Sequence, residues 1–462
     1  MKFKAFLFSF FIALTLNGQS FFYNTQQFGL NSTLLGGAVT AGSSDLSMIY
    51  YNPAALRYAP DKGIDFALFI PSYSITNYGD KLGSGKDVFD RNISFNPSLF
   101  TYKTSIGKFS FVFTLLQKDL WDNDIRHSIL SESPDRISKK ALSYDYEGDE
   151  KWFGIGSSFN ISDHFSVGIS QFWNILNSNY EYGLSSDVQN LVENRLEEFY
   201  SDQFHLNVSS IFSMTTKIGV AYTGKNDKLG VVVTTPYYTP YSNSANFEKA
   251  TSILDFGRTV MTNTIDFDID PVIKNAWEVD LGYSRILPDS SELWFKVAYH
   301  SAVDEYEMFT SDRINLEGLS FVSGLNKVVN LSLGYAKDFN EKFQFLGSVR
   351  TNYNAGIQQS NNQRSQSIIL LEKDRMHIAL GTKIQSRNAS FVVGLDYGFS
   401  ISKESPPFEN FPTFNLLDLQ ETGYSQKTLT LLLTYEFFLD RMGQNISRML
   451  ERDKKESTSY PH

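Results

Sequence analysis

The feature that most constrains the fold of this chain is a two-residue alternation of apolar and polar side chains, which recurs from Gly63 onward. In the stretch 329–336, one face carries Val, Leu and Tyr side chains, whereas the other carries Asn, Ser, Gly and Ala. The stretches 391–399 and 428–437 alternate in the same way. Successive side chains of a β-strand point to opposite faces of the sheet, so this pattern predicts strands with one apolar face. We therefore expect an all-β chain.

The breaks between these strands are alternately short and long. Short breaks include Gly107-Lys108, Ser162-Asp163 and Asn340-Glu341, and long breaks include 122–148. An even number of strands, with tight turns at one end and long loops at the other, is typical of a bacterial outer-membrane barrel. We therefore expect residues 63–439 to form a transmembrane antiparallel β-barrel of about fourteen strands.

Alternation also occurs in soluble β-sandwiches, where the apolar face points inward. The composition of the polar face favours the barrel, because small residues recur there together with charged ones, as expected of a hydrated or plugged lumen. The charged residues of that face are Glu278, Asp280, Lys296, His300, Lys383, Asp396 and Glu436. Aromatic residues make up 15% of the chain, which suits strands and interfacial girdles. Cysteine is absent, which excludes disulfides, a thiol nucleophile and a lipid-attachment cysteine.

The two ends of the chain differ from the strand pattern. Residues 1–20 have the charged, apolar and small-residue regions of a signal peptide, and a retained membrane anchor would need a longer apolar run. Residues 440–462 follow the last strand and carry apolar residues at helical spacing. We expect this tail to lie in the periplasm, as a frayed extension or as a helix that binds a partner.

Two of the long loops show helical periodicity. The first, 183–202, places Val188, Leu191, Val192, Leu196 and Phe199 on one helical face, and the second, 243–261, does the same with Phe247, Ala250, Ile253 and Leu254. Each predicted helix either packs on the barrel rim or offers an apolar surface to a hydrophobic ligand outside the membrane. The candidate residues for ligand capture are Leu196, Phe199, Phe247 and Leu254.

Signatures of catalysis are missing from the sequence. It contains no GxSxG, HExxH, P-loop or GxGxxG motif, and its six His residues lack metal-ligand spacing. We therefore expect no metal, no cofactor and no enzymatic activity, although spacing would not reveal a site assembled across strands. The formal charge of −10 argues against nucleic acid as a partner.

One segment before the first strand contains a short sequence motif that suggests a protein family. Asn52-Pro53-Ala54 follows the small-residue run 36–42, and an Asn-Pro pair by itself is most often a turn. A second stretch, 270–283, reads Asp-Pro and then Ala-Trp-Glu-Val-Asp-Leu-Gly-Tyr after four intervening residues. With these two motifs and Asp45, most of the mature chain resembles the FadL-type family of outer-membrane transporters for long-chain fatty acids and other hydrophobic compounds.

The resemblance implies that residues 21–62 form a hatch inside the barrel, with Asn52, Pro53 and Ala54 as its motif. It further implies a passive channel in the outer membrane of a Gram-negative bacterium, with hydrophobic small molecules and outer-membrane lipid as partners. In this family, hatch movement is thought to release ligand sideways through a gap made by a kinked third strand. The third strand expected here, 109–121, has no Gly or Pro to force a kink.

A different function is also compatible with the sequence. A FadL-fold barrel could act as a non-transporting subunit or scaffold of a larger outer-membrane complex for protein secretion or barrel assembly. The tail 440–462 and the long surface loops motivate this alternative, because both could bind protein partners.

Overall fold

The computed structural model describes residues 22–67, 70–79, 87–96, 99–242, 245–255, 258–269, 271–309, 320–357, 365–367, 373–386, 388–401, 404–405 and 422–438. The expected signal peptide, 1–20, and the expected periplasmic tail, 440–462, lie outside these residues. A short helix, α2 (Met48–Tyr51), and a 3-10 helix, η1 (Pro53–Tyr58), precede the strands.

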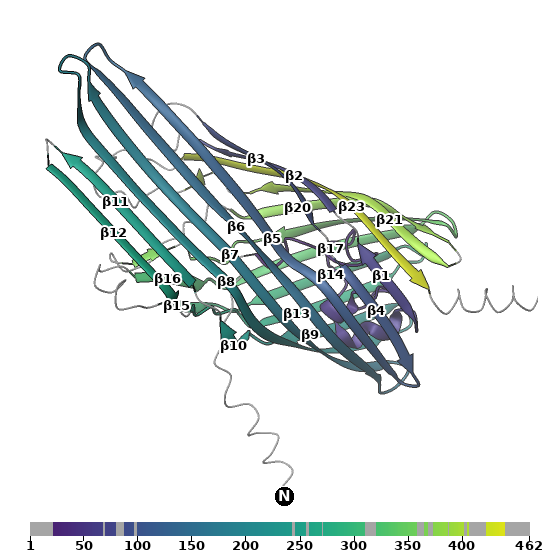
Figure 1. Ribbon diagram of the computed structural model, residues 1–462. Coiled ribbons are helices and arrows are strands. Elements are labelled where there is room, and N and C mark those ends of the chain that lie inside the picture. The colour runs from purple at the N-terminus through teal and green to yellow at the C-terminus, as the bar shows by residue number, and fades with distance from the viewer. Residues whose placement is uncertain are drawn as a thin grey trace, which may run out of the picture.

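The strands account for most of the described residues (Figure 1). Their bounds are β1 (Gly63–Ala67), β2 (Ile70–Tyr78), β3 (Val88–Asn96), β4 (Leu99–Ile106), β5 (Phe109–Glu132), β6 (Arg136–Asn160), β7 (Phe165–Asn190), β8 (Arg195–Thr223), β9 (Asp227–Thr234), β10 (Tyr238–Ser242), β11 (Ala245–Asp255), β12 (Arg258–Ile269), β13 (Glu278–Ile286), β14 (Glu292–His300), β15 (Val303–Phe309), β16 (Ser320–Leu325), β17 (Val328–Asp338), β18 (Phe343–Asn352), β19 (Ser365–Ser367), β20 (Arg375–Gln385), β21 (Ala389–Ser400), β22 (Glu404–Ser405) and β23 (Thr422–Phe438).

The main sheet closes on itself as an antiparallel barrel. Neighbouring strands follow the order β1, β4, β5, β6, β7, β8, β9, β13, β14, β17, β18, β20, β21, β23 and return to β1. Segments such as β2, β3 and β11 pair farther along the same wall. The expected count of about fourteen strands is not confirmed, because the described residues of the main sheet form 20 strand segments.

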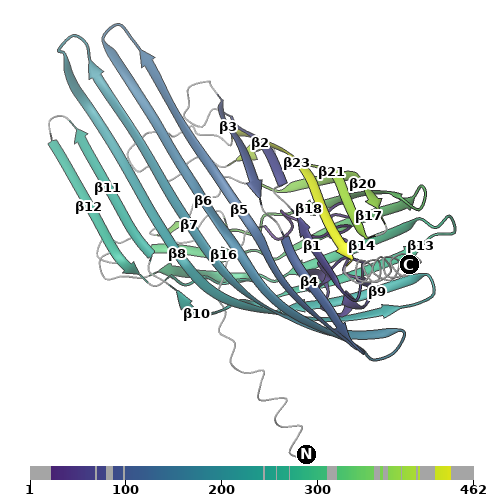
Figure 2. The same ribbon diagram turned by 45° about the vertical axis from the view of Figure 1, so that its right-hand side comes forward.

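Four neighbouring strands are much longer than a membrane requires. The strands β5, β6, β7 and β8 contain 24, 25, 26 and 29 residues, whereas about 9 to 11 residues span a bilayer. They rise as a wall beyond the rest of the barrel, and the β11–β12 hairpin continues this wall next to β8 (Figures 1 and 2). The expected long loop at 122–148 is wrong, because most of it is the β5–β6 ladder, which turns at 133–135.

The two expected helical loops are also strands. Residues 183–202 form the end of β7, a short turn and the start of β8, in which Asp187 pairs with Phe199. The Asn190 side chain accepts hydrogen bonds from the backbone N–H groups of Val192 and Glu193, and Asn194 has φ of 47°, so the chain reverses there. The helical spacing of apolar residues therefore arose from two hairpin arms. Residues 245–255 likewise pair with β8 and β12 as β11.

The apolar face of the strands points outward, as expected for a barrel and opposite to a soluble sandwich. On β17, Leu331 and Leu333 are 43% and 53% exposed, whereas the alternating Asn330 and Ser332 are 1% and 2% exposed. Exposed Leu, Ile, Val and Phe side chains recur in this way on β4, β5, β7, β9, β14, β20 and β21. A continuous outward apolar band with a polar interior is what a lipid environment selects in a barrel.

The outward apolar band leads us to a prediction about the stability of the barrel in lipid. Leu395→Arg, at an outward position of β21 that is 49% exposed, should lower the free energy of unfolding in lipid vesicles by about 2–4 kcal/mol, because a guanidinium would face hydrocarbon. The control is Gln203→Arg at an exposed position of β8, where the neighbouring strands already carry the exposed charged side chains of Arg126 and Glu181. Denaturant titration of both variants should separate them, and equal stability would contradict a lipid-facing band.

Candidate functional site

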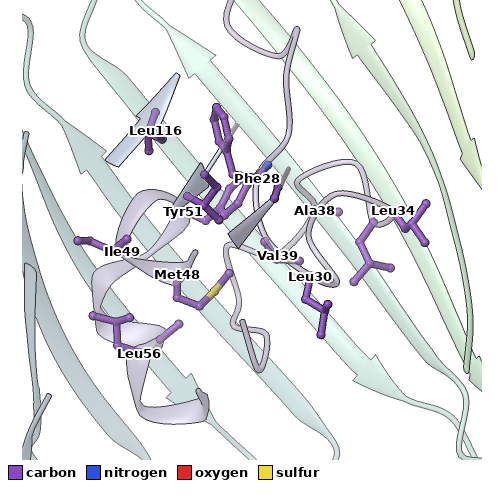
Figure 3. Close-up of a cluster of buried hydrophobic side chains, with 14 of the residues drawn as sticks. Phe28, Leu30, Leu34, Ala38, Val39, Met48, Ile49, Tyr51, Leu56 and Leu116 are labelled. Atoms are coloured by element: carbon purple, nitrogen blue, oxygen red, sulfur yellow. The ribbon is translucent and has the colours of Figure 1, made fainter. Parts of the chain in front are cut away.

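The N-terminal segment, defined here as residues 22–59, lies inside the barrel. Its apolar side chains form one buried cluster with residues of the barrel wall, including Leu116, Trp152 and Phe172. Figure 3 shows Phe28, Met48, Ile49, Tyr51 and Leu56 gathered against one another in front of the strands. The segment therefore fills the lumen with a small core of its own.

Asn52 organises the motif that the sequence singled out. Its Oδ1 atom accepts a hydrogen bond from the Ala54 N–H at 3.1 Å, and so caps η1, while Pro53 occupies the first position of that helix. Its Nδ2 group donates to the Thr40 carbonyl at 2.8 Å and to the Val220 carbonyl of β8 at 3.2 Å. One fully buried side chain thus joins two parts of the segment to the barrel wall.

Asp45 organises the other half of the segment. Its fully buried carboxylate accepts hydrogen bonds from the backbone N–H groups of Asn31 and Ser32 and from the Ser32 hydroxyl, at 2.5–3.0 Å. Gly29 packs so closely against Asp45 and Ser47 that a Cβ atom there would meet both side chains. A buried carboxylate needs such donors, and these bonds fold residues 29–47 into a compact turn.

The barrel wall receives the segment on glycine residues. Gly168 and Gly219 are paired across β7 and β8, and a Cβ atom on either would overlap Pro53 or Asn52. Gly230 pairs with Gly282 in the same manner beneath Thr40 and Ala41. Further such glycines are Gly156 under Ile49, Gly334 under Leu35, and the pair Gly381 and Gly394 under Leu34. These glycines, called here the glycine seat, let the segment approach the strand backbones.

Buried charges line the wall next to the segment. Lys296 Nζ lies 2.8 Å from Asp280 Oδ2, and Lys217 Nζ lies 3.4 Å from Glu278 Oε2. The Lys217 ammonium also lies 4.7 Å from the centre of the Tyr50 ring, a cation–π contact between wall and segment. The expectation that Glu278, Asp280 and Lys296 face the lumen agrees with these contacts.

An aromatic cluster joins the same region. The Tyr50 ring contacts Trp152 and Phe172 at centroid distances of 5.8 and 6.3 Å, and Trp152 contacts Tyr237 at 6.1 Å. Glu150 accepts hydrogen bonds from Trp152 Nε1 at 2.9 Å and from the Tyr237 hydroxyl at 2.6 Å. This arrangement places ring faces and polar atoms side by side next to the segment.

A second apolar cluster occupies the outer end of the barrel. It is rich in tyrosine and includes Tyr78, Ile125, Leu142, Tyr144, Tyr180, Tyr182, Leu206, Val208, Ile211, Ile269, Ile273, Tyr306, Met308 and Tyr424. We call this set the outer apolar cluster.

The four expected capture residues lie on the wall strands. Phe199 of β8 pairs with Leu254 of β11, so the structure brings these two together. Leu196 is 41% exposed near the β7–β8 turn, beside the exposed Leu191 and Val192. Phe247 pairs with Leu206 farther along the wall. The structure does not place the four on shared helical faces.

The glycine seat is the part of the site that sequence reasoning missed. From the sequence alone, repeated small residues on the inward face predict only a small-residue lining of the lumen. A signal is present in the sequence, because Gly168, Gly219, Gly230 and Gly282 all fall on inward positions of the alternation. Recognising a seat would have required the strand register.

Two other features of the described residues bear on function. Within the ranges that the structure covers, no three His, Cys, Asp or Glu side chains are placed to hold a metal ion. In the same ranges, no helix is long and apolar enough to cross a membrane.

The fold and the filled lumen define an outer-membrane type of β-barrel whose N-terminal segment plugs its own lumen. Solved structures that align with this fold include a FadL homologue and channels for hydrophobic compounds. A Pseudomonas aeruginosa FadL homologue aligns with a TM-score of 0.58 and 12% identity over 92% of this chain and 100% of its own. The toluene transporter TodX of P. putida aligns with a TM-score of 0.57 and 11% identity, over 89% and 98% of the two chains.

The CymD monoaromatic hydrocarbon channel has the same fold as well. It aligns with a TM-score of 0.52 and 11% identity, over 90% of this chain and 98% of its own. No protein family and no curated protein matches the sequence. At these identities the comparisons establish the FadL fold, and they confirm at that level the resemblance drawn from the sequence.

Proposed function

We propose that this protein is a passive outer-membrane channel for the uptake of hydrophobic small molecules, with residues 22–59 as a movable hatch. The observation that carries the proposal is the seating of this segment on glycines inside a closed barrel. A barrel whose lumen is filled by its own chain conducts only when the segment moves. The contacts that hold it are hydrogen bonds and packing, which can break and re-form.

The neighbours of known function favour hydrophobic ligands. TodX and CymD are named for toluene and monoaromatic hydrocarbons, and long-chain fatty acids are the other ligand class that the sequence resemblance implies. Moving apolar surface out of water releases roughly 25 cal/mol per Å². A barrel that leads such a molecule from water to apolar surface therefore needs no energy source.

We propose that ligand enters at the outer apolar cluster. This cluster lies at the end of the barrel that the long wall strands extend, beyond the glycine seat. Leu196, Phe199 and Leu254 lie on the same wall, and with Phe247 they remain the candidates for first capture. Exposed apolar residues at the β7–β8 turn, such as Val192 at 78% exposure, suit this role.

A sideways exit is supported by β5. Among the described residues, the β4–β5 ladder extends from Phe109 to Leu116, and no pairing joins β3 to β5. One residue farther on, the register with β6 shifts between Gln117 and Asp119, so Lys118 is the extra residue of a β-bulge that forms without Gly or Pro. We propose that ligand leaves the lumen at this break and enters the bilayer directly.

The remaining assignments follow from this proposal. We infer that the barrel has fourteen strands. The closed ring of strand pairings contains one segment of each strand, and the remaining segments extend these strands. We infer insertion in the outer membrane of a Gram-negative bacterium, after removal of a signal peptide at 1–20, with the tail 440–462 in the periplasm. The outward apolar band supports the membrane location.

A second candidate function is that of a scaffold subunit. It is favoured by β12, whose far edge pairs with no described strand and carries Val260 and Met261 at 55% and 73% exposure. Such an edge can accept a strand from another protein. Gentle solubilisation followed by affinity purification tests it, because a stoichiometric partner that survives washing supports a scaffold and a lone monomer opposes it.

Calorimetry on the purified barrel tests the leading proposal. We expect oleate or toluene to bind in detergent, with a negative heat-capacity change because apolar surface is buried. A matched hydrophilic control, such as arabinose, should show no heat of binding. Absence of binding for both oleate and toluene, in a protein that purifies without bound lipid, would overturn the proposal.

A further inference from the structure

Residues 22–25 are held by a set of contacts separate from the glycine seat. We infer that Arg350 of β18 is the positioning residue that fixes this end of the hatch and thereby sets how often the hatch opens. The inference rests on the proposed function, but its test measures the position of the segment and not transport. It concerns a single side chain, and none of the contacts described above for Asn52, Asp45 or the glycines involves it.

Arg350 binds the backbone of the segment from within the wall. Its Nε group donates to the Asn24 carbonyl and its Nη2 group donates to the Thr25 carbonyl, both at 3.2 Å. The next inward residue of the same strand, Asn352, accepts from the Asn24 N–H at 3.1 Å and donates to the Thr25 hydroxyl at 3.2 Å. Two neighbouring inward residues of β18 thus bind two consecutive residues of the hatch.

Arg350 is itself fixed by two neighbouring strands. Its Nη2 group lies 2.6 Å from Asp396 Oδ2 of β21 and 3.0 Å from His377 Nδ1 of β20. Gly398 leaves room for the His377 ring, since a Cβ atom there would lie 2.8 Å from that ring. The Arg350 side chain is 1% exposed, and the charge-assisted contact of Nη2 with Asp396 holds the guanidinium where Nε and Nη2 reach residues 24 and 25.

The bonds at residue 24 lead to the hatch motif. Gln27 Nε2 donates to the same Asn24 carbonyl at 3.3 Å, and Gln27 Oε1 accepts from the Tyr51 hydroxyl at 3.0 Å. Tyr51 precedes Asn52, and its hydroxyl also accepts from the Phe28 N–H at 2.8 Å. Loss of the Arg350 contacts would therefore loosen a continuous network that ends at the motif, which gives this arginine influence beyond residues 24 and 25.

Two ring contacts mark the same end of the segment. Tyr23 stacks on His300 with a centroid distance of 3.6 Å, and the Arg375 guanidinium lies 4.4 Å from the centre of the Phe22 ring. Neither of these two ring contacts is a bond to the backbone. Arg350 and Asn352 bind the backbone at residues 24 and 25, so their removal should loosen this end of the segment.

Cysteine labelling tests the inference cleanly, because the chain has no native cysteine. The reporter is Gln26→Cys, at a half-buried position next to the contacts, and the probe is a water-soluble maleimide on purified barrel in detergent. Losing charge-assisted hydrogen bonds raises the open population by at least about tenfold. We therefore expect Arg350→Ala to speed labelling by that factor and Arg350→Lys to give a smaller increase, because one ammonium cannot replace the fork.

Two further variants keep the result decisive. Asn352→Ala removes only neutral hydrogen bonds, so it should fold and should also speed labelling, which covers the case in which Arg350→Ala fails to fold. Lys383→Met, which removes another buried lumen cation, should leave the rate unchanged. Heat-modifiable migration on gels confirms that each barrel is folded. Unchanged labelling in folded Arg350→Ala and Asn352→Ala would overturn the inference even if the protein transports, and equal acceleration by Lys383→Met would overturn it too.

Discussion

Gly230→Val should turn the closed barrel into a leaky one. A side chain at this position would overlap the Thr40 carbonyl and approach the Ala41 backbone, so the collision involves main-chain atoms that no rotamer change can move aside. The backbone of Gly230 has no positive φ, hence the new residue strains only the contact with the segment. Such overpacking costs about 1–3 kcal/mol.

That penalty falls on the seated state of the segment. Since about 1.4 kcal/mol corresponds to a tenfold change in an equilibrium, the unseated population should rise about tenfold to a hundredfold. Liposome swelling with arabinose measures the result, because a small sugar enters only through an open lumen. We expect fast swelling with the variant and slow swelling with the unmodified protein.

Gly423→Val is the matched control. It adds the same side chain to a barrel strand, β23, at a glycine where a Cβ atom would meet nothing within 4 Å. The control should swell as slowly as the unmodified protein. If the Gly230 variant folds and is equally tight, the glycine seat does not determine closure.

The β-barrel architecture was predictable because it depends on patterns among residues that are close together in the sequence. Alternation at Val329, Leu331 and Leu333 predicted one apolar face, and the structure places that face outward. The tight turn at Gly107-Lys108 was predicted from its residues and is present, with Gly107 at φ of 61°. Each of these features depends on residues close in the sequence.

The errors arose where strand pairing overrides local spacing. Leu191, Val192 and Leu196 have helical spacing, yet they lie around a turn whose arms are held by neighbouring ladders. The positions of these residues depend on the pairing of β7 with β6 and of β8 with β11, and the local sequence does not indicate this pairing. The same holds for the hatch contacts of Arg350, because it meets Asn24 across 326 positions of the chain.

The candidate site was therefore predictable only in part. The Asn-Pro-Ala motif identified Asn52 from the sequence. In the structure, its buried hydrogen bonds to Thr40 and Val220 join the segment to the barrel wall. Its partners on the barrel wall, such as Gly219, became visible only with the register. The motif can be identified in the sequence, whereas the residues that it contacts are known only from the folded barrel.

Locking the segment should abolish uptake. Leu35 Cβ lies 3.3 Å from the position of a Cβ atom on Gly334, close to the 3.5–4.5 Å typical of a disulfide. The double variant Leu35→Cys with Gly334→Cys should therefore join the hatch to β17. Because the chain has no native cysteine, every disulfide in the variant is the engineered one. The two single variants are the controls, since each keeps one substitution without the cross-link.

Uptake of labelled oleate or toluene by cells that produce the double variant, before and after reduction, tests the movable hatch most directly. We expect uptake at background level in the oxidised protein, recovery on adding reductant, and uptake by both single variants under both conditions. Undiminished uptake by a barrel that is fully cross-linked on gels would show that ligand passes without movement of the hatch, and would contradict the central claim.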